Sequence, residues 1–412
     1  MEATDPDHIV IVGAGIAGLT AALGLHRLGV RSLVLESSDR LRTTGFALAI
    51  WPNAWKALDA LGIGDSLRRD HSLLLGLKTI SAISGLQTTQ RQFSVEGRAQ
   101  EEFEVRCVQR KNLLETLERE LPKGTIRYSS KVVSIEESGP LKLVHLADGS
   151  VLKAKVLIGS DGVNSAVAKW LGLKSPAFSC RAAIRGFLNY NRAHGLEPRI
   201  TLCFGKGVRF GVIPYDDTSV YWFFTWSPSP QEKEIEDDPV KMKQFMLSRL
   251  GNVPDQVREV YERTALENMI MSALRYRHPW ELAWGNISKG NVCVAGDAFH
   301  PMTPDLGQGG CSALEDGVVL ARCLGQALGN NNDDSKGSME QERERIEMGL
   351  KNYARERRWR GVKLVSTAFM VGYIQQGNGK VLTFLRDRVL ATFLAGRLMD
   401  FASFDCGKLS SS

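Results

Sequence analysis

The sequence lacks any long apolar stretch. Its 412 residues contain no run of about 18 uncharged apolar residues, so we expect no membrane-spanning helix. The first apolar strand starts at Ile9, which leaves no room for a cleavable signal peptide, and the opening EATDPD is acidic where transit peptides are Arg-rich. The chain ends in KLSSS and so lacks a terminal SKL address. These absences predict a cytoplasmic protein.

Cysteine, histidine and charge patterns also exclude several classes of protein. The seven cysteines include no CxxC pair and the seven histidines are scattered, so we expect reduced, buried thiols and no metal site. We find no Ser–His–Asp set and no paired carboxylates. The net charge of +6 suits an anionic cofactor or an acidic substrate, but it is too diffuse to predict nucleic-acid binding.

A glycine-rich turn near the start carries the strongest positive signal. The apolar run IVIV (9–12) leads into GAGIAG, a helical stretch and a second apolar strand that ends at Glu36. In a dinucleotide-binding unit, Gly13 permits the tight turn, Gly15 lets the backbone approach a pyrophosphate, and Gly18 lets helix and strand pack closely. The helix N-terminus favours an anion. Glu36 follows at close to the spacing of about 20 residues expected of an acid that binds ribose hydroxyls. The pattern predicts dinucleotide binding; a fortuitous glycine-rich turn is the alternative.

The pattern of apolar residues changes in the middle of the chain. Residues alternate in the manner of β-strands on both sides of a polar turn in VRFGVIPYDDTSVYWFFTW (208–226), which predicts an antiparallel hairpin. Residues 236–277, in contrast, are predicted to be helical. KVLIGSDG (155–162) and NVCVAGDAFHP (291–301) predict two more buried parallel strands of the nucleotide-binding fold. The β-rich middle is therefore expected as an insert between halves of that fold.

Three separated segments together resemble one enzyme family. They are GAGIAG with Glu36, LIGSDGVNS (157–165) and VCVAGDAFHPMTPDLGQGGCSALEDG (292–317). Their combination resembles the FAD-dependent, single-component aromatic-ring hydroxylases, the group that includes para-hydroxybenzoate and salicylate hydroxylases, over nearly the whole chain. WPNAWKALDALG and the tail ending FDCGKL resemble the plant monooxygenase-1-like branch.

The resemblance implies an α/β fold with a divided cofactor domain. A Rossmann-like FAD-binding domain, of the type shared by glutathione reductase and para-hydroxybenzoate hydroxylase, would be interleaved with a β-sheet substrate domain and followed by a helical C-terminus. We expect the FAD-binding domain in residues 1–75, 107–175 and 286–330, the substrate domain in 76–106 and 176–285, and the helical region in 331–412.

The resemblance also implies a set of FAD-binding residues. Asp297 follows a buried strand at its carboxyl end, where open α/β sheets bind ligands, and could accept a hydrogen bond from a ribityl hydroxyl of FAD. The loop 304–310 is poor in side chains and leads into a helix, so its backbone can approach a flat ring and stabilise negative charge on the reduced flavin. Pro304 and Gly307 would form the flavin-face loop. The expected cofactor-binding residues are Gly13, Gly15, Ala17, Gly18, Glu36, Arg110, Asp161, Asp297, Gly307, Gly309 and Gly310.

Several of these assignments have a structural alternative. Asp297 and Asp161 could instead cap helices, and Arg110 could be an exposed arginine at a helix start. The DG motif at Asp161 departs from the family pattern DGxxSxVR, because Ala168 stands at the position of the arginine and Lys169 follows it. This departure weakens any expectation of a pyrophosphate contact from the helix that follows.

Three further charged or ionisable residues lie near these motifs. Arg40 and Arg42 follow Glu36 and could contact the FAD phosphate or ribose, or could stay in a solvated loop. The sequence does not decide between the two arginines. His300, in GDAFHP, is expected to pack structurally, because the chemistry of the family needs no histidine base.

The resemblance implies a flavin monooxygenase. Only one dinucleotide fingerprint is present, so NADPH or NADH would bind transiently as a co-substrate. FAD reduced by NAD(P)H would react with O2 to a C4a-hydroperoxide, which would hydroxylate a small aromatic, salicylate-like or related hydrophobic compound. An apolar face of Phe210, Val212, Tyr221 and Phe223 would roof that substrate, with simple core packing as the alternative.

Other functions and partners remain open at this point. The chain could act on an alkene, as a zeaxanthin-epoxidase-like enzyme or a prenyl reductase, or it could be an inactive flavin-binding protein. We expect a monomer or homodimer. Four arginines and a tryptophan at 355–360 leave peripheral membrane contact open, with a solvated helix face as the favoured interpretation.

Overall fold

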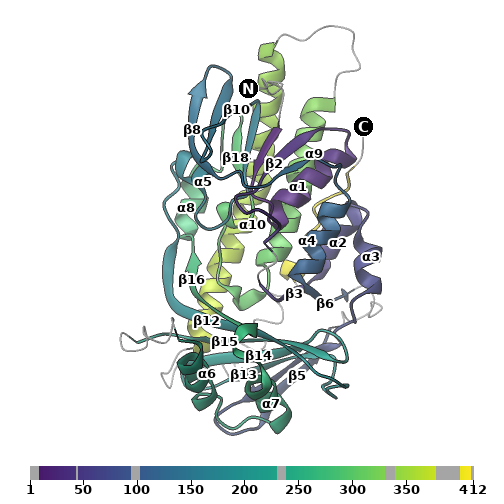
Figure 1. Ribbon diagram of the computed structural model, residues 1–412, viewed down its shortest axis with the longest axis vertical. Helices are drawn as coiled ribbons and strands as arrows, with labels where there is room; N and C mark the ends of the chain where they lie inside the picture. The colour runs from purple at the N-terminus through teal and green to yellow at the C-terminus, as the bar shows by residue number, and fades with distance from the viewer. Residues whose placement is uncertain are drawn as a thin grey trace.

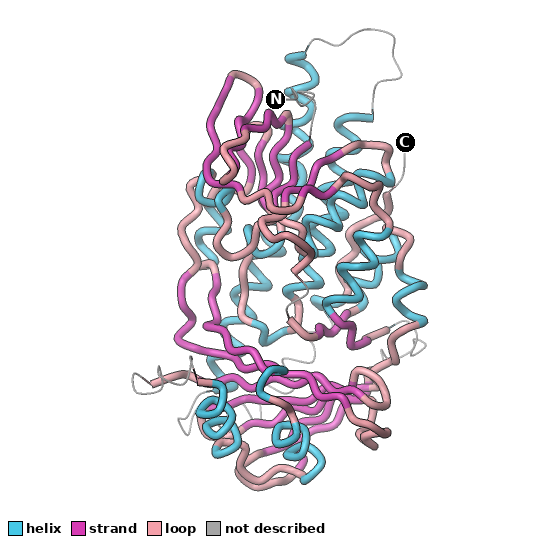
Figure 2. The backbone as a smooth tube through the Cα atoms, in the orientation of Figure 1, coloured by secondary structure: helices cyan, strands magenta, loops and turns pink. Residues whose placement is uncertain are grey.

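Two sheets of different size organise the chain. The computed structural model describes residues 9–42, 45–93, 103–229, 238–329, 339–376 and 400–409. Figures 1 and 2 show a mainly parallel sheet at one end, a larger antiparallel sheet at the other, and helices between them. The expected α/β fold class is confirmed, while the exact domain boundaries stay a prediction.

The six-stranded sheet holds the glycine-rich turn. Its strand order is β17-β18-β11-β1-β2-β7, with only the β17–β18 pair antiparallel. β1 and β11 are buried along their whole length, as strands covered on both faces must be. The expected parallel strands after 155 and 291 are therefore confirmed. The members are β1 (Ile9–Val12), β2 (Ser32–Leu35), β7 (Ile126–Arg127), β11 (Val156–Gly159), β17 (Ser288–Lys289) and β18 (Val292–Val294).

The seven-stranded sheet is assembled from two distant parts of the chain. Its order is β16-β12-β15-β14-β13-β4-β5, and the β4–β13 pair is parallel while the others are antiparallel. The hairpin expected at 208–226 is present as β14 and β15. The members are β4 (Gly76–Ser81), β5 (Gln87–Gln92), β12 (Ala177–Asn189), β13 (Arg199–Phe204), β14 (Val208–Pro214), β15 (Ser219–Trp226) and β16 (Met269–Tyr276).

One expected helical region is partly wrong. Residues 238–263 do form α6 (Pro239–Ser248) and α7 (Asp255–Arg263), but 269–276 is the edge strand β16, paired with β12. The two helices cover the outer face of the seven-stranded sheet (Figure 1). Between sheet and helices lies a separate apolar core that includes Phe210, Trp222 and Phe224.

Smaller strands and the remaining helices complete the fold. They are β3 (Ala47–Ile50) with β6 (Arg106–Gln109), the meander β8 (Val132–Ser138), β9 (Leu141–Leu146) and β10 (Val151–Ala154), and the helices α1 (Ile16–Arg27), α2 (Pro52–Ala60), α3 (Gly64–Arg69), α4 (Arg110–Arg119), α5 (Ala166–Trp170), α8 (Pro279–Trp284), α9 (Gly309–Gly329) and α10 (Met339–Gln376), with the 3-10 turns η3 (Leu266–Asn268), η4 (Gly296–Ala298) and η5 (Pro304–Leu306).

The long helix α10 links the two ends of the molecule. It packs on α8 and α9, on η5 and on β14, and Figure 1 shows it running from the six-stranded sheet down to the seven-stranded one. The helical C-terminal region is therefore present as far as Gln376. Within the described ranges, no helix is both long and apolar enough to cross a membrane.

Candidate functional site

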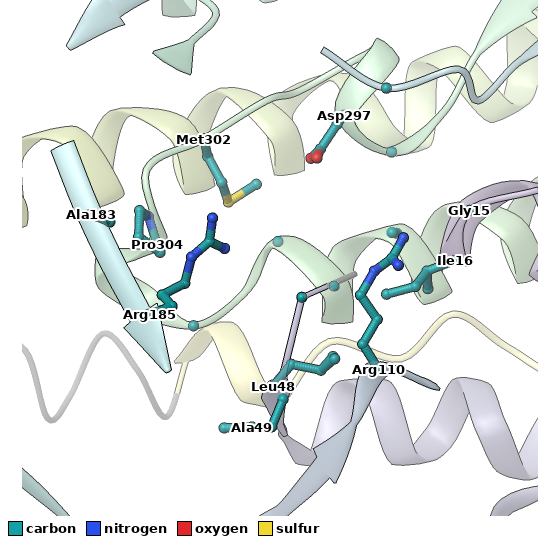
Figure 3. Close-up of a pocket in the computed structure, with 18 of the residues that line it drawn as sticks. Gly15, Ile16, Leu48, Ala49, Arg110, Ala183, Arg185, Asp297, Met302 and Pro304 are labelled. Atoms are coloured by element: carbon teal, nitrogen blue, oxygen red, sulfur yellow. The ribbon is translucent and has the colours of Figure 1, made fainter. Parts of the chain in front are cut away.

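A cavity of about 890 Å³ lies between the two sheets. The residues that follow β1, β2, β11 and β18 all line it, so it opens at the carboxyl ends of the parallel strands, where ligands bind in α/β folds. Its opposite wall is the inner face of the seven-stranded sheet. Figure 3 shows side chains from both walls directed into this space.

The three glycines of the first turn have different structural roles. Gly13 has φ +101°, and a Cβ there would lie 2.5 Å from the carbonyl oxygen of Ser160. At Gly18 a Cβ would lie 2.0 Å from the Gly13 oxygen, so close helix–strand packing requires the glycine. At Gly15 the nearest heavy atom would be 4.0 Å away. Packing therefore does not require Gly15, and the space beside its backbone stays open to the cavity.

Glu36 is a buried carboxylate that organises this turn. It accepts hydrogen bonds from the backbone N–H of Ala14 (3.0 Å) and of Ser38 (3.0 Å). Burial acts to raise the pKa of Glu36, but these backbone donors and the Arg42 guanidinium at 3.3 Å outweigh it and hold the pKa below its ordinary value. Of the two arginines left open by the sequence, Arg42 pairs with Glu36 and lines the cavity, whereas the Arg40 side chain is 87% exposed.

Arg110 approaches the same end of the cavity from α4. Its side chain hydrogen-bonds the carbonyl oxygen of Arg42, and Figure 3 shows its guanidinium directed toward Gly15 and Ile16. Burial, and then the charge of Arg42, lower the pKa of Arg110. Helix α1 begins here without a side-chain cap, so the positive end of its dipole and two arginines converge on one place.

Asp297 reaches the middle of the cavity from η4. Its carboxylate is directed into the cavity (Figure 3), and within the described part of the chain it has no hydrogen-bond or ion-pair partner. The helix-cap alternative is therefore not observed. Burial raises its pKa, opposed by the charges of His300 and Arg110. The preceding Gly296 has φ +59°, and a Cβ there would lie 2.8 Å from that of Ala17, so two small residues bring this turn against α1.

The glycine-rich loop at 304–310 forms the next part of the wall. Gly307 has φ +63°, and a Cβ at Gly310 would lie 2.7 Å from Leu48. At Gly309, the first residue of α9, the nearest heavy atom to a Cβ would be 4.0 Å away. The N-terminus of α9 is thus a second positive helix end that opens on the same cavity as α1.

Asp161 also borders the cavity, but its carboxylate already accepts hydrogen bonds from neighbouring residues of the chain. It accepts hydrogen bonds from the Ser165 hydroxyl (2.5 Å) and the Ala166 N–H (2.7 Å), and so holds the turn before α5, whose N-cap is Ser165. The role of Asp161 in binding FAD stays a prediction. Ala168 is buried in the core, and α5 contains no arginine that could reach the cavity.

A buried ionic cluster ties the loop to the seven-stranded sheet. The Asp305 carboxylate accepts from Arg181 Nη1 (3.0 Å) and Nη2 (2.6 Å) and from Arg209 Nη1 (3.0 Å), and all three side chains are at most 6% exposed. A Cβ at Gly372 of α10 would lie 1.9 Å from Arg181 Nη1, so this glycine makes room for the cluster. Sequence reasoning missed these residues; the available signal was an arginine inside each of two apolar strands.

A second buried network lies behind the loop, between α9 and α10. Arg357 donates to Asp316 (2.6 Å) and lies 2.6 Å from Glu315, and all three side chains are fully buried. His300 hydrogen-bonds Asp316 at 2.7 Å and is fully buried too, in keeping with a packing role. Arg360 also pairs with Glu315. The arginine-rich stretch 355–360 is therefore not a simple solvated face, because part of it is buried as ion pairs.

The expected aromatic roof is half correct. The register pairs Phe223 with Gly211 and Tyr221 with Ile213, so these residues share the cavity-facing side of the hairpin. Phe210 and Val212 point to the opposite side and belong to the core under α6 and α7. Their assignment to the substrate roof is wrong, because neighbouring strand residues alternate between faces.

The cavity fits a dinucleotide that carries a flat ring. It combines two helix N-termini, two glycines with open space beside their backbone, and the Asp297 carboxylate, which has no hydrogen-bond or ion-pair partner among the described residues. These features match the polyanionic and the planar parts of FAD and its polyhydroxyl linker.

Comparisons with known proteins agree with this assignment. Residues 7–354 match the family model described as FAD binding domain. Monooxygenase 2 of Arabidopsis thaliana is 51% identical over 413 residues, covering 99% of this chain and all of the relative. Monooxygenase 1 of the same plant is 36% identical over 404 residues, covering 97% and 99%. The crystal structure of Klebsiella pneumoniae HpxO with FAD and uric acid superposes with a TM-score of 0.81 at 24% identity, covering 98% of each chain.

Proposed function

Since the chain belongs to the FAD-binding family of aromatic-hydroxylase-type monooxygenases and is an FAD-dependent enzyme of that kind, we propose that it uses NADPH or NADH with O2 to hydroxylate a small aromatic or related hydrophobic compound. The observation that carries this proposal is the continuity of one cavity. It runs from the glycine-rich turn, past Asp297 and the 304–310 loop, to the apolar face of the seven-stranded sheet.

The cavity residues divide naturally among the parts of FAD. Glu36 would hold the adenosine ribose, and the α1 N-terminus with Arg110 would hold the pyrophosphate. Asp297 would accept from the ribityl hydroxyls, and the N–H groups at the start of α9 would face the ring. FAD held in this way would supply the redox chemistry of the reaction.

The protein's own contribution is position, dryness and local charge. The sheet face presents Leu202, Ile213 and Phe223 to the cavity, which excludes water from a ring placed there. Burial raises the pKa of Tyr221 to about 12, so its phenol stays protonated at neutral pH. The Asp305 ion cluster fixes η5 against the sheet, which holds the flavin-face loop at a constant distance from the substrate wall.

Incorporation of oxygen from O2 into product tests the proposal. Purified FAD-loaded protein is supplied with NADPH or NADH and heavy-isotope O2, together with a panel of aromatic acids, phenols and apolar alkenes, and products are weighed by mass spectrometry. One heavy oxygen atom in a ring hydroxyl is the expected result. An epoxide would instead identify the alkene-directed alternative, and a saturated product without heavy oxygen would identify a reductase.

We also propose that the protein works in the cytoplasm. All seven cysteines are free and six of them are buried, which raises the pKa of their thiols, in keeping with a reducing compartment such as the cytoplasm. A monomeric or homodimeric state is still expected.

A further inference from the structure

Three exposed tryptophans gather on two neighbouring helices outside the cavity. The chain has eight tryptophans; five are buried or half-buried, whereas Trp280, Trp284 and Trp359 are 52%, 82% and 58% exposed. The first two belong to α8 and the third to α10, and Figure 1 shows α8 next to α10, against which it packs. None of the three lines the cavity, so the proposed chemistry does not account for their exposure.

Specific contacts hold these rings in place. Arg358 of α10 donates hydrogen bonds to three backbone carbonyl groups at the end of α8, over 2.7 to 3.1 Å, and so ties this end of α8 to α10. The Trp280 ring stacks on that of His278, with centroids 4.2 Å apart and planes inclined by 10°. Trp280 and Trp284 are four residues apart and therefore share one face of α8.

The outer side of α10 continues the same surface. Arg355, Trp359 and Lys363 follow one another at intervals of four residues and are all exposed, so their side chains lie along one side of the helix. Met370 and Tyr373, which are 41% and 62% exposed, fall on the same side by the helical period. We call this the tryptophan surface, and its apolar members are Trp280, Trp284, Trp359, Met370 and Tyr373.

Positive charge lies beside the exposed rings without matching negative charge. Neither Arg355 nor Lys363 forms an ion pair with a carboxylate of the described residues; Arg355 donates only to an asparagine of its own helix. The one carboxylate of α8, that of Glu281, is already paired with Lys174 at 3.5 Å. Glu356 turns to an arginine of α9 at 2.8 Å. The surface therefore favours a negatively charged partner, in line with the net charge of +6 of the whole chain.

This combination of side chains suits a lipid surface. A contiguous exposed apolar patch indicates an interaction site, and indole rings are at home in the headgroup layer of a membrane, because one edge is polar and the rest apolar. Rings that project from the outer sides of helices can enter that layer without a pocket of matching shape. Lysine and arginine side chains next to them can meet the headgroups of anionic lipids, which the cytoplasmic leaflet contains.

We propose that the tryptophan surface docks the protein on membranes that contain anionic lipids. The indoles of Trp284 and Trp359 enter the headgroup layer, and Arg355 and Lys363 contact the anionic groups of the lipids. The protein then lies on the bilayer and does not cross it, which agrees with the absence of a membrane-spanning helix among the described residues. The proposal does not depend on the reaction, since none of these side chains lines the cavity.

Vesicle binding tests the proposal with the full chain. FAD-loaded protein is mixed with vesicles of phosphatidylcholine alone or of an equimolar mixture with phosphatidylserine, and the bound fraction is measured by co-sedimentation at low and high salt. A parallel series contains brominated phosphatidylcholine, which quenches tryptophan fluorescence on contact. One double variant combines Trp284→Ala with Trp359→Ala, and a second combines Arg355→Gln with Lys363→Gln.

Two variants of similar chemistry outside α8 and α10 are the controls. Leu86→Ala removes a side chain that is 69% exposed on the turn between β4 and β5, and Lys123→Gln removes an exposed charge that follows α4. Bound FAD, measured from its absorbance, shows that each variant is folded. The arginine–lysine pair keeps the test decisive if the tryptophan pair does not fold.

We expect the wild type and both controls to bind the mixed vesicles, less tightly at high salt, with quenching by brominated lipid. Loss of the two tryptophans should weaken binding by about 10- to 100-fold and remove most of the quenching. Loss of the two cations should weaken binding to the mixed vesicles by about 10- to 30-fold. No binding of the wild type at low salt, or equal binding of the wild type and both double variants, would overturn the proposal.

Other occupants of the surface give different results. A dimer that forms with rising concentration in sedimentation velocity, disappears in the tryptophan variant and binds no vesicles would assign the surface to a second copy of this chain. Either that outcome or a monomer that ignores vesicles would refute membrane docking. The monooxygenase proposal would stand in both cases, because it is tested by incorporation of oxygen into product.

Discussion

Replacement of Asp305 by asparagine should destabilise the protein far more than loss of a surface ion pair. The carboxylate is fully buried and accepts three hydrogen bonds from Arg181 and Arg209, which are themselves 5% and 6% exposed. Asp305→Asn leaves two buried guanidiniums without a counter-ion. Breaking a buried ion pair in this way costs about 3–5 kcal/mol.

The effect should also depend on pH in a defined direction. Burial acts to raise the pKa of Asp305, but the Arg181 and Arg209 guanidiniums outweigh it and hold the pKa below its ordinary value. A carboxyl whose pKa is lower in the folded state stabilises the protein above its unfolded pKa of about 3.9. This contribution is lost as the pH falls through the folded pKa. The difference between wild type and Asp305→Asn should therefore be constant near neutral pH and shrink in acid.

Urea unfolding of FAD-free protein measures this difference. Midpoints are compared under one set of conditions, because a chain with two sheets need not unfold in one step. Glu259→Gln is the control, since it breaks the Arg263–Glu259 pair, whose side chains are both 48% exposed, and such pairs contribute only about 0.3–0.5 kcal/mol. If Asp305→Asn lowered the midpoint no more than Glu259→Gln does, the cluster would not hold the loop as described.

Three further outcomes follow from the same structure. Asp297→Ala should weaken FAD binding by about 10- to 100-fold in equilibrium dialysis, while the exposed Asp217→Ala should not; full retention of FAD by the first variant would contradict the assignment of Asp297. Gly15→Ala should keep the thermal stability of FAD-free protein but bind FAD poorly, whereas Gly18→Ala should unfold at lower temperature because its Cβ would lie 2.0 Å from the Gly13 oxygen; equal stability of the two variants would refute the packing argument. Burial acts to raise the pKa of Asp316, but His300 and Arg357 lower it to about 2, so its contribution is present above its ordinary pKa of 3.8 and disappears as the pH falls toward 2. Circular dichroism should accordingly show that Asp316→Asn and wild type differ in stability at pH 7 and converge in acid, and a difference that persisted at pH 2 would count against this ion network.

Local sequence patterns were sufficient to predict the half of the cavity that we propose holds FAD. The strand–turn–helix unit with Gly13 and Gly18 is specified by residues that are close in sequence, because a positive φ and a close backbone approach leave little choice but glycine. Asp297 follows directly from its place after a buried strand. These features can be predicted because each depends on a few neighbouring residues.

The half of the cavity formed by the seven-stranded sheet could not be predicted in the same way. Strand β16 was missed because its partner β12 lies about ninety residues earlier in the sequence, and an edge strand carries a weak alternation of its own. The inner face of the hairpin depends on the register set by its turn, which pairs Ile213 with Tyr221 and so separates Phe210 from Phe223.

The buried ion clusters could not be predicted from the sequence either. Arg181, Arg209 and Asp305 come from three elements, and nothing in the sequence indicates that they meet. A charged residue within an apolar strand signals only that some partner exists, since a buried charge without one is too costly.

Anaerobic mixing of FAD-loaded protein with NADPH and NADH tests the central claim most directly. The loss of flavin absorbance is followed with and without a panel of aromatic acids, phenols and amides. The account predicts that one co-substrate reduces the flavin and that a ring compound accelerates the reduction. Absence of reduction by either co-substrate, with every member of the panel, would contradict the claim that this cavity belongs to an NAD(P)H-dependent monooxygenase.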